Sequence, residues 1–152
     1  MLRLRKQVRF VMAGAGDMLP HMIERTAELK MGRRFHFTGF LGPAEVERIY
    51  RMSDSYVMPS VSEPFGISPL EAMCYDVPVI ISRQSGVAEV LKNAIKVDFW
   101  DIRDLTDKIV ALLDHQPLRQ ELQQQGAREL EGIQWSQAAA RIEAVYQSCA
   151  GG

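Results

Sequence analysis

Short apolar runs alternate with longer amphipathic stretches along most of the chain. The apolar runs predict strands at about residues 7–13, 34–38, 55–59, 78–82 and 95–98. Apolar side chains at helical spacing predict helices at about residues 18–31, 43–52, 69–75, 86–92, 102–114, 117–131 and 136–149. Alternation of strands with helices is typical of an α/β fold. We expect a doubly wound, Rossmann-like parallel sheet of about five strands, followed by extra carboxyl-terminal helices.

In such a sheet, right-handed crossovers place the loops that follow the strands along one edge. Four such loops are expected to line this rim: residues 14–16, 39–41, 63–68 and 85–86. Open α/β sheets bind their ligands in the crevice at this edge.

The loop after the third strand and the helix that follows it carry two glutamates separated by seven residues, around a glycine. Glu63 follows the strand, and Glu71 lies in the first turn of the next helix. Gly66 permits a close backbone approach, and free amides at the start of a helix bind anions. Carboxylates accept strong hydrogen bonds from neutral hydroxyls. A ligand that places a phosphate on these amides and hydroxyls on the glutamates would be a nucleotide-sugar.

Each glutamate also has a purely structural interpretation. The segment Ser68-Pro69-Leu70-Glu71 fits a capping box, in which Ser68 caps the helix and Glu71 folds back onto the Ser68 amide. Glu63 could be a solvated carboxylate of a surface loop. Spacing alone does not decide between these roles and ligand binding.

Three stretches together resemble a known family: residues 59–73, 78–82 and 85–90. They are similar to the carboxyl-terminal domain of retaining glycosyltransferases of the group-1 and glycogen-synthase type, which have the two-domain GT-B architecture. Residues 35–40, 54–60 and 135–137 extend the resemblance over most of the chain. It implies a domain that binds a nucleotide-diphosphosugar donor for retaining glycosyl transfer.

The resemblance also implies roles for particular residues. Glu63 would contact the donor sugar and is the candidate catalytic residue, and Glu71 would accept from the ribose hydroxyls. The amides at Phe65, Gly66 and Ile67 would hold sugar or phosphate. The loop Gly39, Phe40 and Leu41 would contact the base, although Phe40 could equally pack in the core. The family requires no metal, and we expect no cofactor beyond the donor substrate.

The chain departs from the family at two places. Ser85 stands where the family usually has the first of two glycines. The strand and helix whose arginine and lysine hold the diphosphate in the family have no counterpart before the first strand. The basic residues Arg3, Arg5, Lys6 and Arg9 do not match that pair, and we expect them on a solvated face. We therefore expect residues 1–152 to form one nucleotide-sugar-binding domain, truncated at its amino-terminal edge, whose amino-terminal partner domain is missing.

Composition narrows the class of protein. The net charge of −1 and the pI of about 6.3 argue against a nucleic-acid binder. No apolar run reaches the length of roughly 18 residues that a membrane span requires. Two isolated cysteines, Cys74 and Cys149, form neither a metal motif nor a disulfide framework, so a cytoplasmic location is expected.

The same residues are compatible with two other functions. A stand-alone nucleotide or nucleotide-sugar binding module without transfer activity would use the same residues, and a sugar-nucleotide epimerase shares the two-domain architecture. A dinucleotide site at Gly14-Ala15-Gly16 is disfavoured because Leu19 replaces the third glycine. Asp17 is expected to cap the helix that follows.

The last third of the chain contains none of the candidate site residues. Leu105, Ile109, Leu112 and Leu113 repeat at helical spacing and predict a core face, with Leu118, Leu122 and Leu130 less regularly placed. Trp135 and Tyr146 suggest a terminal helix that packs back across the domain or toward the absent one.

Overall fold

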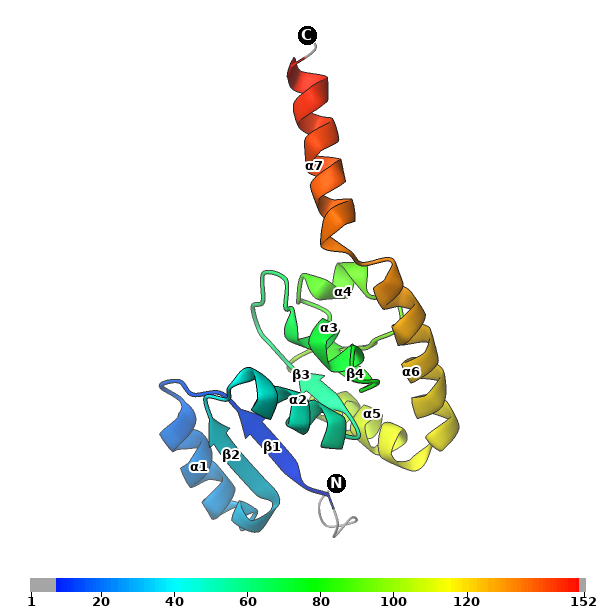
Figure 1. Ribbon diagram of the computed structural model, residues 1–152. Coiled ribbons are helices and arrows are strands. Elements are labelled where there is room, and N and C mark those ends of the chain that lie inside the picture. Colours follow the sequence, from blue (N-terminus) through cyan, green and yellow to red (C-terminus); the bar gives the residue numbers. More distant parts are fainter. Residues whose placement is uncertain (1–7, 151–152) are drawn as a thin grey trace. The chain divides into compact units, whose positions relative to one another are not determined.

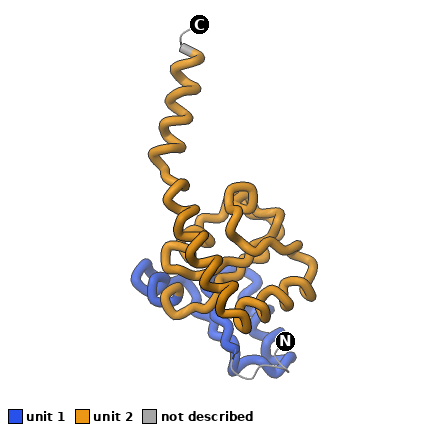
Figure 2. The backbone as a smooth tube through the Cα atoms, turned by 90° about the vertical axis from the view of Figure 1, so that its right-hand side faces the viewer, with its two compact units in different colours: residues 1–49 blue, residues 50–152 orange. Residues whose placement is uncertain are grey.

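The computed structural model describes residues 8–150 and shows an α/β chain that ends in three consecutive helices (Figure 1). Contacts divide the chain into two compact units, residues 1–49 and 50–152 (Figure 2). The strands are β1 (Phe10–Ala13), β2 (Phe35–Gly39), β3 (Tyr56–Met58), β4 (Val79–Ser82) and β5 (Ile95–Val97). The helices are α1 (Leu19–Glu28), η1 (Gly32–Arg34), α2 (Pro43–Met52), α3 (Ser68–Met73), α4 (Val87–Val90), α5 (Ile102–Asp114), α6 (Gln116–Glu131) and α7 (Trp135–Ala150).

All five expected strands are present and every pairing between them is parallel, so the α/β fold class is confirmed. They are divided between two sheets, with order β1-β2 in the first unit and β3-β4-β5 in the second. Gln7, the first residue of the first expected strand, lies outside the described residues, as do Arg3, Arg5 and Lys6. Arg9 is described, and its Nη1 donates to the carbonyl of Arg33 at 2.8 Å.

The amino-terminal unit is built on the β1-β2 pair. Phe10 stacks on Phe35 with ring centroids 4.8 Å apart, in register with the strand pairing. Helix α1 starts at Leu19 behind Met18, and no side chain caps it, so the expected cap by Asp17 is wrong. The chain turns directly through Gly16, whose carbonyl accepts from the Leu19 amide at 3.0 Å.

The core of the carboxyl-terminal unit lies around β4, whose four residues are all buried. Ile80 packs with Val97 of β5 and Leu112 of α5, and Leu105, Ile109 and Leu122 cover this cluster. Residues of a strand point alternately to its two faces, so Val79 and Ile81 fill the opposite face. The predicted core face of α5 is therefore confirmed, whereas Leu118 of α6 is exposed.

Residues 135–149 of helix α7 are all exposed. Trp135 is 83% exposed and Tyr146 is 71% exposed. The expectation that this helix packs back across the domain is wrong. None of the helices among residues 8–150 has the length and apolar character needed to span a membrane.

Candidate functional site

Two loops at the carboxyl ends of neighbouring strands are bound to each other. They are the β3–α3 loop, residues 59–67, and the β4–α4 loop, residues 83–86. The amide of Gly86 donates to the carbonyl of Glu63 at 3.0 Å, and the amide of Val87 donates to the carbonyl of Phe65 at 2.7 Å. Glu63 and Ser85 also form an isolated parallel bridge. The β4–α4 loop thus fixes the backbone on which Glu63 is carried.

Gly86 makes this close approach possible. A β-carbon at residue 86 would lie 2.0 Å from the carbonyl oxygen of Pro64, which is far inside van der Waals contact. The neighbouring Ser85 does not obstruct the approach, because its side chain is buried and its hydroxyl donates to the carbonyl of Ser82 at 2.7 Å. Replacement of the family's first glycine by serine is therefore accommodated within the loop.

Gly66 shapes the turn between the two glutamates. Its φ of +92° lies in a region that residues with a side chain rarely adopt. A β-carbon there would also lie 3.0 Å from Cε of Met58 and 3.1 Å from Cγ of Glu63. Glu63 therefore packs directly over the glycine, which defines where its half-buried side chain lies.

Helix α3 begins without a capping box. Ile67 is the N-cap residue, and no side chain caps the helix. The hydroxyl of Ser68 instead accepts from the hydroxyl of Tyr56 at 2.8 Å. The capping-box alternative for Glu71 is therefore wrong. Because α3 has only six residues, its dipole is small, and any anion binding here rests mainly on individual amides.

The Glu71 carboxylate is exposed and has one protein partner in the described part of the chain. Its Oε2 lies 3.4 Å from the hydroxyl of Tyr50, which also lies 3.3 Å from the carbonyl of Ser68. Burial, followed by the charges of Tyr56 and Glu71, raises the pKa of Tyr50 far above its usual range. The Tyr50 hydroxyl therefore stays protonated and acts as a donor. Most of the acceptor capacity of Glu71 remains open to a ligand.

Sequence reasoning missed Tyr50 and Tyr56. Burial raises the pKa of Tyr56 as well, while its bond to Ser68 opposes the shift. A tyrosine in a helix or strand is typical of core packing, so the pattern gives no reason to assign it to a site. The one available signal is that a buried tyrosine hydroxyl usually finds a polar partner.

The expected base-binding loop belongs to the amino-terminal unit. Gly39 has a φ of +67°, and its carbonyl accepts from the Gly14 amide at 2.8 Å. Phe40 is 85% exposed, so the alternative that it packs in the core is wrong for this unit. Leu41 is half-buried. The loop Gly14–Gly16 borders a separate hollow of about 260 Å³, lined mainly by apolar side chains of β1 and α1.

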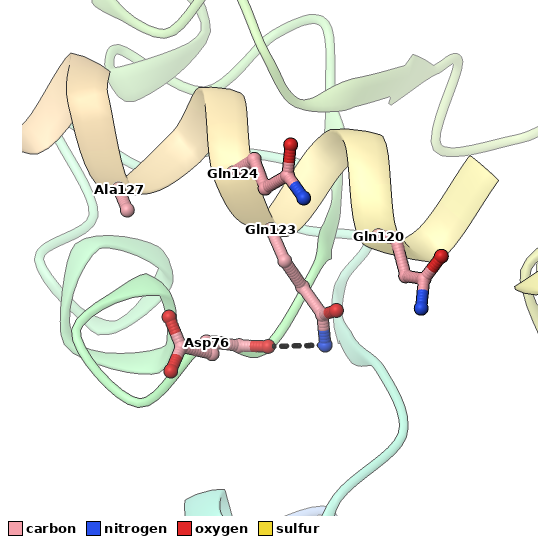
Figure 3. Close-up of a pocket in the computed structure, with 5 residues that line it drawn as sticks. All are labelled: Asp76, Gln120, Gln123, Gln124 and Ala127. Carbon is pink, nitrogen blue, oxygen red and sulfur yellow. Dashed lines mark hydrogen bonds between the residues drawn. The ribbon is translucent and has the colours of Figure 1, made fainter. Parts of the chain in front are cut away.

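A further hollow, of about 470 Å³, lies away from these loops in the carboxyl-terminal unit (Figure 3). It is lined by Asp76, Gln120, Gln123, Gln124 and Ala127. Asp76 precedes β4, so this hollow lies near the amino end of that strand and contains none of the expected site residues. Among residues 8–150, no group of histidine, cysteine and acidic side chains is arranged to hold a metal ion.

Comparisons with known proteins identify the family to which the chain belongs. A family model described as glycosyl transferases group 1 matches residues 1–129. The D-inositol 3-phosphate glycosyltransferase of Corynebacterium diphtheriae is 29% identical over 141 residues, which are 91% of this chain and 33% of that protein.

Two solved structures share the fold. HepE of Anabaena, in complex with UDP and glucose, matches with a TM-score of 0.83 and 18% identity over 93% of this chain and 41% of that one. The carboxyl-terminal domain of LpcC, a group 1 family glycosyl transferase of Francisella tularensis, matches with a TM-score of 0.76 and 24% identity. That match covers 86% of this chain and 72% of the LpcC domain.

The match covers only part of the longer proteins. The chain spans between 23% and 33% of the length of the three curated relatives that it matches first. What it matches is their carboxyl-terminal part, in agreement with the LpcC domain. By its sequence match and its fold, the chain belongs to the group 1 glycosyltransferases.

Proposed function

We propose that this chain is the donor-binding domain of a retaining glycosyltransferase and binds a nucleotide-diphosphosugar. The observation that carries the proposal is the pair of glutamates around Gly66, in a loop whose Glu63 and Phe65 carbonyls accept from the amides of Gly86 and Val87. Glu63 would bind hydroxyls of the donor sugar, and the exposed Glu71 would bind those of the ribose. The family and the UDP and glucose in the HepE structure support this ligand class.

The amides of the β3–α3 loop complete the proposed donor site. In the described part of the chain, the amides of Gly66 and Ile67 donate to no protein acceptor. At Phe65, Gly66 and Ile67 they would hold the sugar or a phosphate. The base would contact Gly39, Phe40 and Leu41, where an exposed aromatic ring is available for stacking.

Transfer would replace the nucleoside diphosphate at the anomeric carbon by the oxygen of an acceptor hydroxyl, with retention of configuration, and the departing diphosphate would take the hydroxyl proton. Negative charge grows on the departing diphosphate as its bond to the sugar breaks. Fixed donors aimed at that charge lower the barrier, because they need no reorganisation during the reaction. Glu63 would orient the sugar ring so that its anomeric carbon faces the acceptor, which a second domain would supply.

The test is a thermal-shift titration of the purified chain with UDP, GDP and ADP and with their sugar conjugates. A ligand present at about 100 times its dissociation constant stabilises the folded protein by about 2.7 kcal/mol. We expect a shift with at least one nucleotide and a larger affinity for its sugar conjugate. If no nucleotide shifts the melting temperature, donor binding by this chain is refuted.

Two substitutions separate the roles of the glutamates. Glu63→Gln should remove the preference for the sugar conjugate over the free nucleotide, whereas Glu71→Gln should weaken both ligands equally. Each substitution removes a hydrogen bond between the ligand and a charged group. Such a bond contributes about 1.5–3 kcal/mol, so the affinity should fall roughly 10- to 100-fold. Glu131→Gln is the matched control, because Glu131 is an exposed carboxylate at the end of α6. An equal loss in all three variants would contradict the assignment.

A further inference from the structure

Tyr50 is held rigidly beside the carboxylate that we assign to the ribose. It lies in the last turn of α2 and is only 8% exposed. Its ring meets that of Tyr56 edge-on, with centroids 5.9 Å apart, and stacks on that of Tyr75 at 5.8 Å. Two aromatic neighbours leave the ring little freedom, so the direction of its hydroxyl is fixed.

The Tyr50 hydroxyl has two acceptors and one proton. The carbonyl oxygen of Ser68 is 3.3 Å away and Oε2 of Glu71 is 3.4 Å away. Both distances exceed the usual 2.7–2.8 Å of a hydroxyl donor, as expected for a proton shared by two acceptors. One acceptor belongs to the first residue of α3 and the other to a side chain one turn later. Tyr50 thus ties the Glu71 carboxylate to the backbone that carries it.

We propose that Tyr50 is the positioning residue of Glu71 and thereby sets the preference of the site for ribonucleotides over deoxyribonucleotides. This inference rests on the proposed function. By contacting Oε2, Tyr50 selects one orientation of an otherwise exposed carboxylate and leaves Oε1 free for ligand hydroxyls. A carboxylate oriented before binding loses less conformational freedom when the ribose arrives.

The neighbouring tyrosines show that the role is specific to Tyr50. The hydroxyl of Tyr56 donates to Oγ of Ser68 at 2.8 Å and is not bonded to the carboxylate. Tyr75 contributes its ring to the stack and, with the cationic Arg51 5.0 Å from its ring centroid, belongs to the packing around Tyr50. Removal of the Tyr75 hydroxyl therefore leaves the contact between Tyr50 and Glu71 in place.

The experiment compares nucleotide affinities by isothermal calorimetry on the purified chain. The probes are UDP, GDP and ADP with their 2′-deoxy counterparts, and the pair that binds most tightly is used. Tyr50→Phe keeps the ring stack and removes only the hydroxyl. We expect it to weaken the ribonucleotide about fivefold, the size of one shared hydrogen bond, and to leave the deoxynucleotide nearly unchanged. Tyr75→Phe should change neither affinity.

A double variant isolates the path through Glu71. In a Glu71→Ala background, Tyr50→Phe should cause no further loss, because the group that it positions is gone. If Tyr50→Phe lowers the melting temperature, the ratio of the two affinities, measured well below that temperature, still decides the question.

Three outcomes would overturn the inference. An equal loss for both nucleotides leaves the ratio of their affinities unchanged and would give Tyr50 a purely structural role. If Glu71→Ala weakens the ribonucleotide while Tyr50→Phe does not, only the positioning role fails. If the wild-type chain binds no nucleotide, the proposed function fails and this inference with it.

Discussion

The contact of Gly86 with the β3–α3 loop depends on the absence of a single carbon atom. Gly86 has φ −59° and ψ −34°, which are helical angles that alanine adopts readily. Backbone preference alone would therefore favour alanine at this position. The β-carbon would nevertheless lie 2.0 Å from the oxygen of Pro64 and 3.0 Å from Cα of Phe65. Since both of these are backbone atoms, the loop itself would have to move.

We expect Gly86→Ala to destabilise the chain by about 3 kcal/mol, the upper part of the range for overpacking. It should also weaken nucleotide-sugar binding, because the displaced loop carries Glu63. Urea denaturation and the thermal-shift titration measure the two effects. Gly132→Ala is the matched control, since its β-carbon would meet nothing closer than the carbonyl oxygen of Glu129 at 3.5 Å. Equal stability of the two variants would contradict the steric argument.

At the scale of the element, helices α1 and α3 end in the same strained way. Lys30 follows α1 with a φ of +56°, and Asp76 follows α3 with a φ of +58°. After α3, the amides of Asp76 and Val77 donate back to the carbonyls of Met73 and Ala72, both at 3.1 Å. This helix end normally carries glycine, because a left-handed backbone costs other residues free energy.

Asp76→Gly should therefore stabilise the chain by about 0.5–1 kcal/mol, after allowance for the greater freedom of glycine in the unfolded chain. The carbonyl of residue 76 would still accept from Nε2 of Gln123, a bond of 2.8 Å that Figure 3 shows. Asp76→Ala keeps the strain and is the control. Chemical denaturation checks the order of stability, and a gain with alanine as large as that with glycine would refute the explanation.

Helix α6 holds the segment after α4 through one carboxylate. Oε1 of Glu129 accepts from the amide of Lys92 at 2.6 Å, and Oε2 accepts from the amide of Asn93 at 2.9 Å. Asn93 adds a side-chain bond of 3.0 Å to the same oxygen. The segment after α4 is thus held by a residue far away in sequence, and spacing gave no indication of this contact.

Helices and strands are more predictable from the sequence than the contacts between side chains. Period and length located all five strands, because buried parallel strands are short apolar runs between turn residues. The motif predicts Glu63, Gly66 and Glu71 as site residues, and these roles stay predictions. The partners of Ser68 and Glu71 were not predictable, because Tyr50 and Tyr56 reach them from other elements. The capping box failed for the same reason, since a tertiary partner took the Ser68 hydroxyl.

At the scale of the whole molecule, the donor site that we propose is only part of what transfer requires. The chain spans about a third or less of the curated relatives that it matches first. Transfer needs an acceptor held close to the anomeric carbon and water kept away from it. The proposed residues of this chain all serve the donor.

We therefore expect the 152-residue chain to bind its donor without consuming it. Coupled detection of the released nucleoside diphosphate should give a rate no higher than that of a buffer blank, under conditions in which calorimetry shows the donor bound. Glu63→Gln serves as the comparison. Release by the wild-type chain that this substitution abolishes would show that these residues alone can break the bond to the sugar.

The backbone bonds from Gly86 and Val87 also make motion of the β3–α3 loop observable. Both amides donate to carbonyls of that loop, those of Glu63 and Phe65. Neither amide can exchange with deuterium until the two loops separate, so their exchange rates report how often this occurs. A ligand that bridges Glu63 and Glu71 would slow that exchange at positions that need not touch the ligand. Exchange at Gly86 and Val87 would therefore report whether a ligand occupies the proposed site.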